Sequence, residues 1–261
     1  MRWFLHLAYK GGGFSGWQAQ PGGVRTVQGV LEDALGKLMR CPTPLTGAGR
    51  TDAGVNASMM VAHFDTYTDI PDTQRFIASL NGMADPRAIT VFGLTKVADD
   101  AHARFDATSR TYRYYFHLAR TPFLEPLSWR APATLDIDAM NEAGRLLLGV
   151  RDFTSFAKLH SDARTNICRL DCARIVPVES DESGLRYYLE IRADRFLRNM
   201  VRAVMGTLAD VGRHKISPSG VIDIADRLDR CAAGTSMPPE PLFLHEITYP
   251  YWSPAVMCPV P

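Results

Sequence analysis

The segment SRTYRYYFH at residues 109–117 decides how the rest of the sequence is divided, because its side chains alternate with a period of two. One face of the segment carries Arg110, Tyr112, Tyr114 and Phe116. Such alternation with aromatic residues is typical of a β-strand. The strand opens a second series of strands and helices, comparable in length to the series before it, so the sequence predicts two halves of similar size.

The first half is predicted to mix strands with helices. Large side chains at alternate positions favour a strand at residues 3–9, and apolar residues at spacings of three and four favour an amphipathic helix at residues 27–39. Thr26, immediately before this helix, is a good N-cap residue. The same criteria predict strands at residues 43–46, 59–64 and 88–97 and a helix at residues 73–80.

The second half is predicted to pair its strands antiparallel. Two long strands, at residues 167–178 and 185–193, flank a polar turn at residues 180–184, and a short turn joins antiparallel neighbours. The remaining predicted elements are helices at residues 136–148, 197–211 and 218–232 and a strand at residues 243–249.

Neither half has the regular β-α-β alternation of a parallel doubly wound sheet, so the sequence predicts an α+β fold. We place an N-terminal half at residues 1–105, a C-terminal half at residues 106–250 and a proline-rich tail at residues 251–261.

The composition excludes several classes of protein. The chain has 261 residues, of which 46% are hydrophobic and 22% charged, and a net charge of +1, which is typical of a globular protein. Its apolar runs are too short to cross a bilayer and its first residues do not resemble a signal peptide, so we expect a cytoplasmic location. The five cysteines lack metal-site spacing and no dinucleotide fingerprint is present, so we expect neither a metal nor a redox cofactor.

The segment GAGRTDAGV at residues 47–55 concentrates the residues most suited to chemistry. Its three glycines allow a backbone to approach a ligand closely, while Arg50 and Asp52 project from the same short stretch. A single carboxylate can act as a nucleophile if it is ionised, and a nearby arginine favours the charged form. The alternative is an ordinary surface turn, for which Asp followed by Gly is common.

A second group of candidates is basic and aromatic. Arg195, Arg198 and Arg202 have helical spacing and predict a basic stripe on the helix at residues 197–211; the alternative is a solvated charged face. The segment HARF at residues 102–105, together with the strand that begins at residue 109, interleaves basic and aromatic side chains as sheets that stack RNA bases do. For Tyr114 and Phe116 the alternative is simple core packing.

The glycine-rich connection at residues 11–23 completes the list of candidates. It carries Phe14 and Trp17, which are expected to be exposed because no periodic element surrounds them, followed by Gln18. Its glycines lack the helix-opening context of a dinucleotide site.

Taken together, these stretches resemble the TruA family of tRNA pseudouridine synthases. GAGRTDAGV at residues 47–55 resembles the catalytic signature of that family, and the other matches follow in the family's order over about residues 3 to 250. These are GWQ at 16–18, HARF at 102–105, Arg113-Tyr114, DFTSF at 152–156, FLRNMVR at 196–202, and Leu242-Phe243-Leu244 with Tyr249-Pro250.

The resemblance implies two RRM-like halves whose antiparallel sheets join into one continuous sheet around a central RNA-binding cleft, and a homodimer that binds tRNA. It implies isomerisation of uridine to pseudouridine at positions 38, 39 and 40 of the anticodon stem-loop, without a cofactor.

By the same resemblance, Asp52 would be the nucleophile and Arg202 its partner, Tyr112 would stack on the target base as a candidate acceptor of the C5 proton, and Arg50 would hold the uridine turned out of the stem. The implied RNA-binding residues are Phe14, Trp17, Gln18, Arg110 and Arg198.

Two positions depart from the family pattern. Asn56 stands where the family usually has His, and Lys10-Gly11-Gly12 stands where it usually has Asp-Gly-Ser/Thr. Asparagine cannot carry a proton charge, so a titrating role at position 56 is in doubt. Two alternatives stay open: a non-catalytic RNA-binding protein on the same fold, and a pseudouridine synthase that acts on another RNA.

Overall fold

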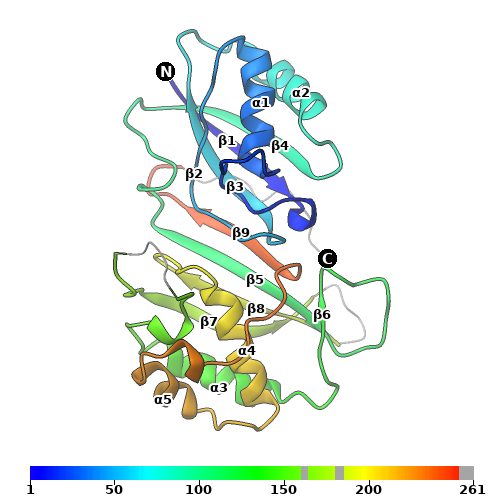
Figure 1. Cartoon of the computed structure of the whole chain (residues 1–261), viewed down its shortest axis with the longest axis vertical. Helices are drawn as coiled ribbons and strands as arrows, with labels where there is room; N and C mark the ends of the chain where they lie inside the picture. The colour runs from blue at the N-terminus through cyan, green and yellow to red at the C-terminus, as the bar shows by residue number, and fades with distance from the viewer. Residues whose placement is uncertain (160–163, 180–184, 253–261) are drawn as a thin grey trace. The chain divides into compact units, whose positions relative to one another are not determined.

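The computed structural model describes residues 1–159, 164–179 and 185–252, which form two compact units (Figure 1). One unit is Met1–Thr108 with the C-terminal segment from Leu244; the other is Ser109–Phe243. The described residues form nine strands, most of them paired antiparallel, and five α-helices. The predicted α+β class is therefore confirmed.

The sheet of the first unit has the strand order β4-β1-β3-β9. β1 (Arg2–Tyr9) lies between β3 (Asn56–Asp65) and β4 (Ile89–Val97) and is antiparallel to both. The C-terminal strand β9 (Leu242–Thr248) lies beside β3, and the two-residue strand β2 (Thr46–Gly47) pairs with β3 at His63 and Ala62. These strands confirm the predictions for this half, except that the strand predicted at residues 43–46 is shorter and shifted.

β1 is buried on both faces, from Trp3 to Tyr9. On one face, Phe4 contacts the rings of Tyr249 and Trp252, with ring centroids 5.5 and 5.4 Å apart. The C-terminal segment, as far as Trp252, therefore packs against β1. The rest of the predicted tail, residues 253–261, lies outside the described residues.

The helices of the first unit begin where the sequence predicts. α1 (Val27–Met39) is preceded by Thr26, whose side chain accepts a hydrogen bond from the backbone N–H of Gly29 at 3.2 Å. α2 (Thr73–Met83) is capped in the same way by Asp72 and runs three residues beyond the predicted end. Each helix thus starts at a side chain that satisfies a free N–H group of its first turn.

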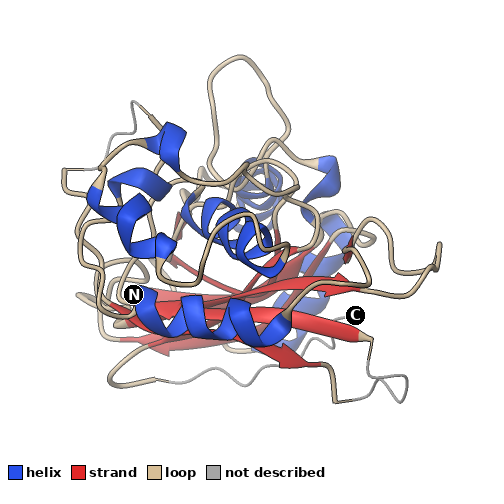
Figure 2. Cartoon of the chain, turned by 90° about the horizontal axis from the view of Figure 1, so that it is seen from below, coloured by secondary structure: helices blue, strands red, loops and turns tan. Residues whose placement is uncertain are grey.

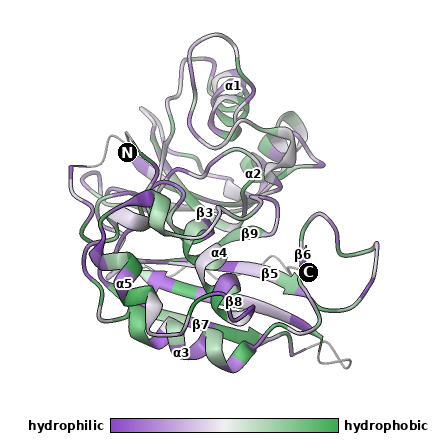
Figure 3. Cartoon of the chain, turned by 60° about the horizontal axis from the view of Figure 1, so that its bottom comes forward, coloured by the Kyte–Doolittle hydropathy of each residue, from purple (hydrophilic) through white to green (hydrophobic). Residues whose placement is uncertain are grey.

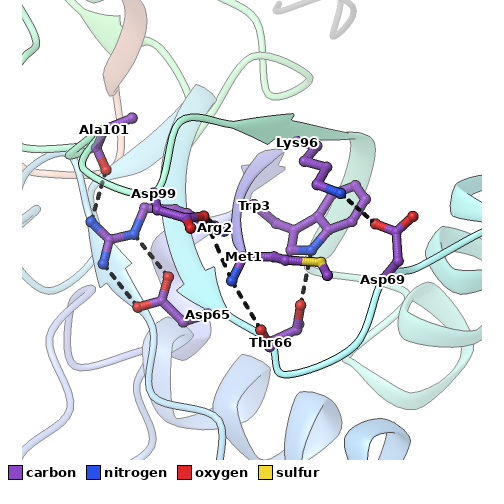
Figure 4. A network of polar contacts seen from close by, with 9 residues as sticks. All are labelled: Met1, Arg2, Trp3, Asp65, Thr66, Asp69, Lys96, Asp99 and Ala101. Atoms are coloured by element: carbon purple, nitrogen blue, oxygen red, sulfur yellow. Dashed lines mark hydrogen bonds and ion pairs between the residues drawn. The ribbon is translucent and has the colours of Figure 1, made fainter.

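Polar contacts hold the start of β1 to the segment that follows β4 (Figure 4). The guanidinium of Arg2 donates to both carboxylate oxygens of Asp65, at 2.9 and 2.8 Å, and to the carbonyl oxygen of Ala101 at 3.0 Å. The Arg2 hydrogen bond also holds the pKa of Asp65 below its usual value. Since Ala101 directly precedes residues 102–105, these contacts help to place the HARF segment.

The second unit has a three-stranded antiparallel sheet in the order β5-β8-β7. These strands are β5 (Ser109–His117), β8 (Arg186–Ala193) and β7 (Leu170–Pro177), and a short parallel strand, β6 (Trp129–Arg130), pairs with β5. Hydrophobic and hydrophilic residues are interspersed along β7 and β8 (Figure 3). The predicted antiparallel pairing is confirmed; the polar turn predicted at residues 180–184 lies outside the described residues.

Helices lie alongside the strands of this unit (Figure 2). α3 (Ile137–Leu147) packs on β7 and on α4 (Met200–Gly212). A Cβ atom at Gly144 would lie only 2.4 Å from the carbonyl oxygen of Ala173, so this residue lets the helix approach the sheet closely. In the described part of the chain, none of the helices is both long and apolar enough to cross a membrane.

Two helix predictions in this half need correction. α4 begins at Met200 instead of Leu197, because Asn199 has a left-handed φ of 66° that cannot continue a helix. α5 (Gly220–Asp226) is shorter than the helix predicted at residues 218–232, since the chain turns at Leu228, where φ is 49°.

Candidate active site

Asp52 begins a tight turn between β2 and β3. The N–H of Val55 donates to the Asp52 carbonyl oxygen at 3.2 Å, and Gly54, third in the turn, has φ of 81°, as a type II turn requires. Asp52 is half-buried. The turn therefore holds the Asp52 backbone between two paired strands.

The glycine-rich loop at residues 11–23 supports this turn through a hydrogen bond to Thr51. The N–H of Trp17 donates to the Thr51 carbonyl oxygen at 3.2 Å, and the hydroxyls of Tyr9 and Thr51 are 2.7 Å apart. Gly16 has φ of 92°, and a Cβ atom there would lie 2.6 Å from the same Thr51 oxygen. Only glycine fits at this position, and the residue before Asp52 is held by both β1 and the loop.

The loop aromatics are not exposed, contrary to the prediction. Phe14 and Trp17 are 5% and 1% exposed. The Trp17 ring fills the space where a side chain at Gly47 would lie, and the Arg25 guanidinium lies over the Phe14 ring, 4.5 Å from its centroid. Both aromatics therefore pack the loop onto the scaffold, and this burial depends on contacts with residues distant in sequence.

Arg50 is oriented by the same loop. Its Nε donates to Oε1 of Gln18 at 3.0 Å, and Nε2 of Gln18 donates to Oε1 of Gln28, at the start of α1, at 2.8 Å. Arg50 also borders a cavity of about 230 Å³. The cavity is lined by Gln18, Gln28, Leu45, Thr46, Gly47, Gly49, Arg50 and Arg104. Arginine and amide groups that line a cavity suit an anionic or hydrogen-bonding ligand.

The two departures from the family pattern are in contact with each other. Asn56 is 1% exposed, and its Oδ1 accepts a hydrogen bond from the N–H of Gly11 at 2.8 Å. The Asn56 side chain, at the first residue of β3, thus supports the start of the glycine-rich loop. Sequence spacing does not indicate this contact, because the residues are 45 positions apart.

The HARF segment at residues 102–105 lies outside the strands, between β4 and β5, so only the segment that begins at residue 109 forms a strand. The N–H of Ala103 donates to Nδ1 of His63 at 3.2 Å, and the Tyr249 hydroxyl donates to the Ala103 carbonyl oxygen at 2.6 Å. Phe105 is 75% exposed beside the His102 ring. Burial, with a smaller contribution from the charge of Arg2, lowers the pKa of His63 to about 4. These contacts replace strand pairing in holding the segment.

The second unit carries Tyr112 and its aromatic neighbour. Tyr112 is 9% exposed, and its ring meets that of Phe196 edge-on, with centroids 5.0 Å apart and an angle of 84°. Tyr114 and Phe116, two and four residues along β5, are fully buried, which confirms the core-packing alternative for both. Burial raises the pKa of the Tyr114 hydroxyl.

The arginines of this unit do not form the predicted helical stripe. Arg202 is on the first turn of α4, where its Nε donates to the Met237 carbonyl oxygen. Arg195 and Arg198 precede the helix because the left-handed Asn199 separates them from it. Arg110, on β5, donates from Nη1 to the Asp194 carbonyl oxygen at 3.0 Å.

The structure thus gathers the candidates into two groups. In the first unit, Arg50 is hydrogen-bonded to Gln18 and lies two residues before Asp52, and Phe14 and Trp17 are buried in the adjoining loop. The candidates of the second unit are Tyr112, Arg110, Arg198 and Arg202. Sequence analysis missed Tyr9, Thr51 and Gln28; for Gln28 a signal existed, since a polar residue occupies a position beside the apolar face of α1.

Comparisons with known proteins all match this chain to tRNA pseudouridine synthases. A family model described as tRNA pseudouridine synthase matches residues 143–250. The tRNA pseudouridine synthase A of Parabacteroides distasonis is 48% identical over 249 residues, which cover 95% of this chain and 96% of the relative. The protein of the same name from Bacteroides thetaiotaomicron is also 48% identical, covering 95% and 91%, and that of Geobacter sulfurreducens is 39% identical, covering 94% and 98%.

Proposed function

Since the chain belongs to the tRNA pseudouridine synthase A family, a family of isomerases, we propose that it converts uridine to pseudouridine at positions 38, 39 and 40 of the tRNA anticodon stem-loop. One observation carries the assignment of the site: Asp52 begins a turn whose preceding residue, Thr51, is held by both Tyr9 and Trp17. A nucleophile must be positioned accurately to be effective.

The reaction needs one nucleophilic carboxylate and no other reactant. The Asp52 carboxylate attacks the nucleoside and forms a bond to it, the N-glycosidic bond breaks and the uracil turns within the site. C5 is then joined to C1′, and the bond to Asp52 breaks, which frees the carboxylate. The proton on C5 is lost and N1 gains one, so the product is an isomer of the substrate. The proposal covers attack at C1′ of the ribose or at C6 of the uracil, because either leads to the same product, and no cofactor takes part.

Arg202 and Tyr112 are proposed to complete the chemistry. Arg202 pairs with the Asp52 carboxylate, and Tyr112 stacks on the target base and takes the C5 proton. The contact of Tyr112 with Phe196 supports this role, because an edge-on neighbour restricts the orientation of the ring.

The remaining candidates are proposed to bind RNA. Arg50 holds the uridine turned out of the stem, which costs a few kcal/mol in lost stacking. Gln18, Arg110 and Arg198 contact the RNA around it. Because Phe14 and Trp17 are buried, their contribution is to hold the loop that presents Gln18.

The larger assembly is proposed from the family. Residues 1–105 carry the Asp52 turn and residues 106–250 carry Tyr112 and the basic residues, as two RRM-like halves whose sheets join into one around the RNA cleft. We further propose a cytoplasmic homodimer that binds tRNA. β9 supports the joining of the sheets, because its residues are divided between the two units.

The test is tritium release from unmodified tRNA transcripts labelled at uridine C5, with the wild type and Asp52→Asn side by side and the product position mapped. The wild type should release tritium with pseudouridine at 38 to 40, while Asp52→Asn binds tRNA with nearly unchanged affinity and does not turn over. Binding by both proteins without release by either would favour the non-catalytic RNA-binding alternative. Release with modification at another site or in another RNA would favour a different substrate.

A further inference from the structure

We infer that Gln28 is a positioning residue for Arg50 and acts through Gln18, an inference that rests on the proposed function. The three side chains form a continuous relay from the first turn of α1 to the segment that carries Asp52. Gln28 contacts Gln18, and Gln18 contacts Arg50, so the effect of Gln28 on the reaction is indirect.

The amide of Gln28 has all four of its hydrogen-bonding positions occupied. Its Nε2 donates to Oε1 of Glu32 at 2.8 Å and to the Leu45 carbonyl oxygen at 2.9 Å. Its Oε1 accepts from Nε2 of Gln18 at 2.8 Å and from the Ala19 N–H at 2.9 Å. An amide has two donor hydrogens and two acceptor lone pairs, so the reversed orientation would place like groups together at every contact.

The fixed orientation of Gln28 determines that of Gln18. Gln28 presents an oxygen to Gln18, so Gln18 must use its Nε2 there and turn its Oε1 outward. Arginine has donors only, and Nε of Arg50 meets this oxygen at 3.0 Å. A glutamine with the opposite orientation would present an NH₂ group to the guanidinium and repel it.

The relay is anchored in the scaffold at its buried end. Gln28 is 8% exposed, and Oε1 of Glu32 accepts from the Leu45 N–H as well as from Gln28. The backbone N–H of Gln28 also donates to the Trp17 carbonyl oxygen at 3.0 Å. Helix α1, the glycine-rich loop and the segment before β2 therefore all meet at this residue.

Such an arrangement benefits a residue that must hold an extruded base. A free arginine side chain samples many rotamers, and ordering it on binding costs free energy. With Nε bound to Gln18, the plane of the Arg50 guanidinium is restricted before RNA arrives. The relay therefore lowers the cost of reaching the state in which the uridine is turned out, and it should affect kcat more than tRNA affinity, which rests on many phosphate contacts.

The test measures kcat and KM for tritium release and the tRNA Kd for Gln18→Ala, Gln28→Ala and Arg50→Ala, alone and in pairs. Gln18→Ala and Gln28→Ala should each lower kcat about tenfold or more, since a bond to a charged group is lost or misdirected, with the tRNA Kd within about threefold of the wild type. In the Arg50→Ala background, either change should alter kcat by less than about twofold, because the relay then has nothing to orient.

Gln20→Ala is the matched control. Gln20 is on the same loop and donates from Nε2 to the Ser15 carbonyl oxygen at 3.1 Å, outside the relay, and its removal should leave kcat within about twofold. If Gln28→Ala does not fold, Gln18→Ala still tests the relay, because Gln18 is not part of the buried core.

The outcomes separate the two claims. Turnover by the wild type with undiminished kcat in Gln18→Ala overturns the relay and leaves the proposed function intact. A Gln28→Ala effect that persists undiminished in the Arg50→Ala background also overturns it, because Gln28 would then act on the scaffold as a whole. A folded wild type without turnover overturns the proposed function and the relay with it.

Discussion

The backbone N–H of Trp17 donates to the carbonyl oxygen of Thr51 at 3.2 Å, and so joins the glycine-rich loop to the residue that precedes Asp52. The Trp17 ring is 1% exposed and packs where Gly47 has no side chain. The candidate nucleophile therefore depends on a loop more than thirty residues away for its position. Changes in that loop should affect the site without touching any reacting group.

Gly16→Ala should lower both stability and activity. The alanine would have to adopt a left-handed φ, and its Cβ would clash with the Thr51 carbonyl oxygen, which belongs to the backbone and cannot rotate away. We expect a loss of at least about 2 kcal/mol in the free energy of unfolding, and a lower kcat because small displacements of a reacting group are costly. Urea unfolding and tritium release measure the two effects.

Two glycines of the same loop serve as controls for this prediction. Gly22 has a positive φ of 86° with nothing near its Cβ position, and Gly12 has open space without a positive φ. Gly22→Ala should show only the backbone strain, about 1 to 2 kcal/mol, and Gly12→Ala almost no loss. Equal losses in all three variants would contradict the role given to the Thr51 contact.

Asn56→Ala should destabilise the protein by about 1 to 3 kcal/mol, because the buried N–H of Gly11 loses its acceptor. Asn56→His supplies a ring nitrogen that can accept a hydrogen bond from the same N–H. Its free energy of unfolding should therefore be closer to that of the wild type than the value for Asn56→Ala. If the alanine and histidine variants are equally destabilised, the Gly11 contact is not the reason this position matters.

Tyr112→Phe and Tyr114→Phe should have opposite consequences. Losing the Tyr112 hydroxyl should reduce the rate of tritium release about 100-fold or more if it accepts the C5 proton, while the ring keeps its contact with Phe196. The Tyr114 hydroxyl is buried without a hydrogen-bond partner among the described residues, so its removal should leave stability unchanged or raised and activity intact. A large loss of activity in Tyr114→Phe alone would show that the roles are reversed.

The free energy of unfolding should fall as the pH drops from about 6.5 to about 4. Burial, together with the nearby charge of Arg2, lowers the pKa of His63 to about 4, while an unfolded histidine titrates near 6.5. Within this interval the unfolded chain binds a proton that the folded protein does not, so acid favours unfolding. Between pH 6.5 and 5 the loss from His63 is at most about 2 kcal/mol.

His63→Asn isolates this contribution. Asparagine can accept the hydrogen bond from the Ala103 N–H but does not titrate, so its unfolding free energy should depend less on pH than that of the wild type. The other histidines with lowered pKa values, His6, His102 and His117, contribute to both proteins and cancel in the comparison. Urea denaturation at pH 7.5 and pH 5 measures the difference, and equal losses in both proteins would contradict the assignment to His63.

The sequence by itself determined the elements whose signals are local. Period-two alternation located β1 and β5, and a helical spacing with Thr26 at its start located α1 to the residue. These signals act within about four residues, because capping and side-chain periodicity are properties of one turn or one strand. The candidate turn at Asp52 could be located for the same reason, since its glycines and Asp52 are close together in the sequence.

The tertiary structure alone decided which side chains are buried, and with what partner. Phe14 and Trp17 lie in a loop without periodicity, and their burial follows from packing against residues far along the chain. A polar residue beside the apolar face of α1 marked Gln28, but its four partners could not be identified from the sequence, because they come from a loop, a helix and the segment before β2. Contacts between distant segments form only when the chain has folded, and spacing along the sequence carries no direct record of them.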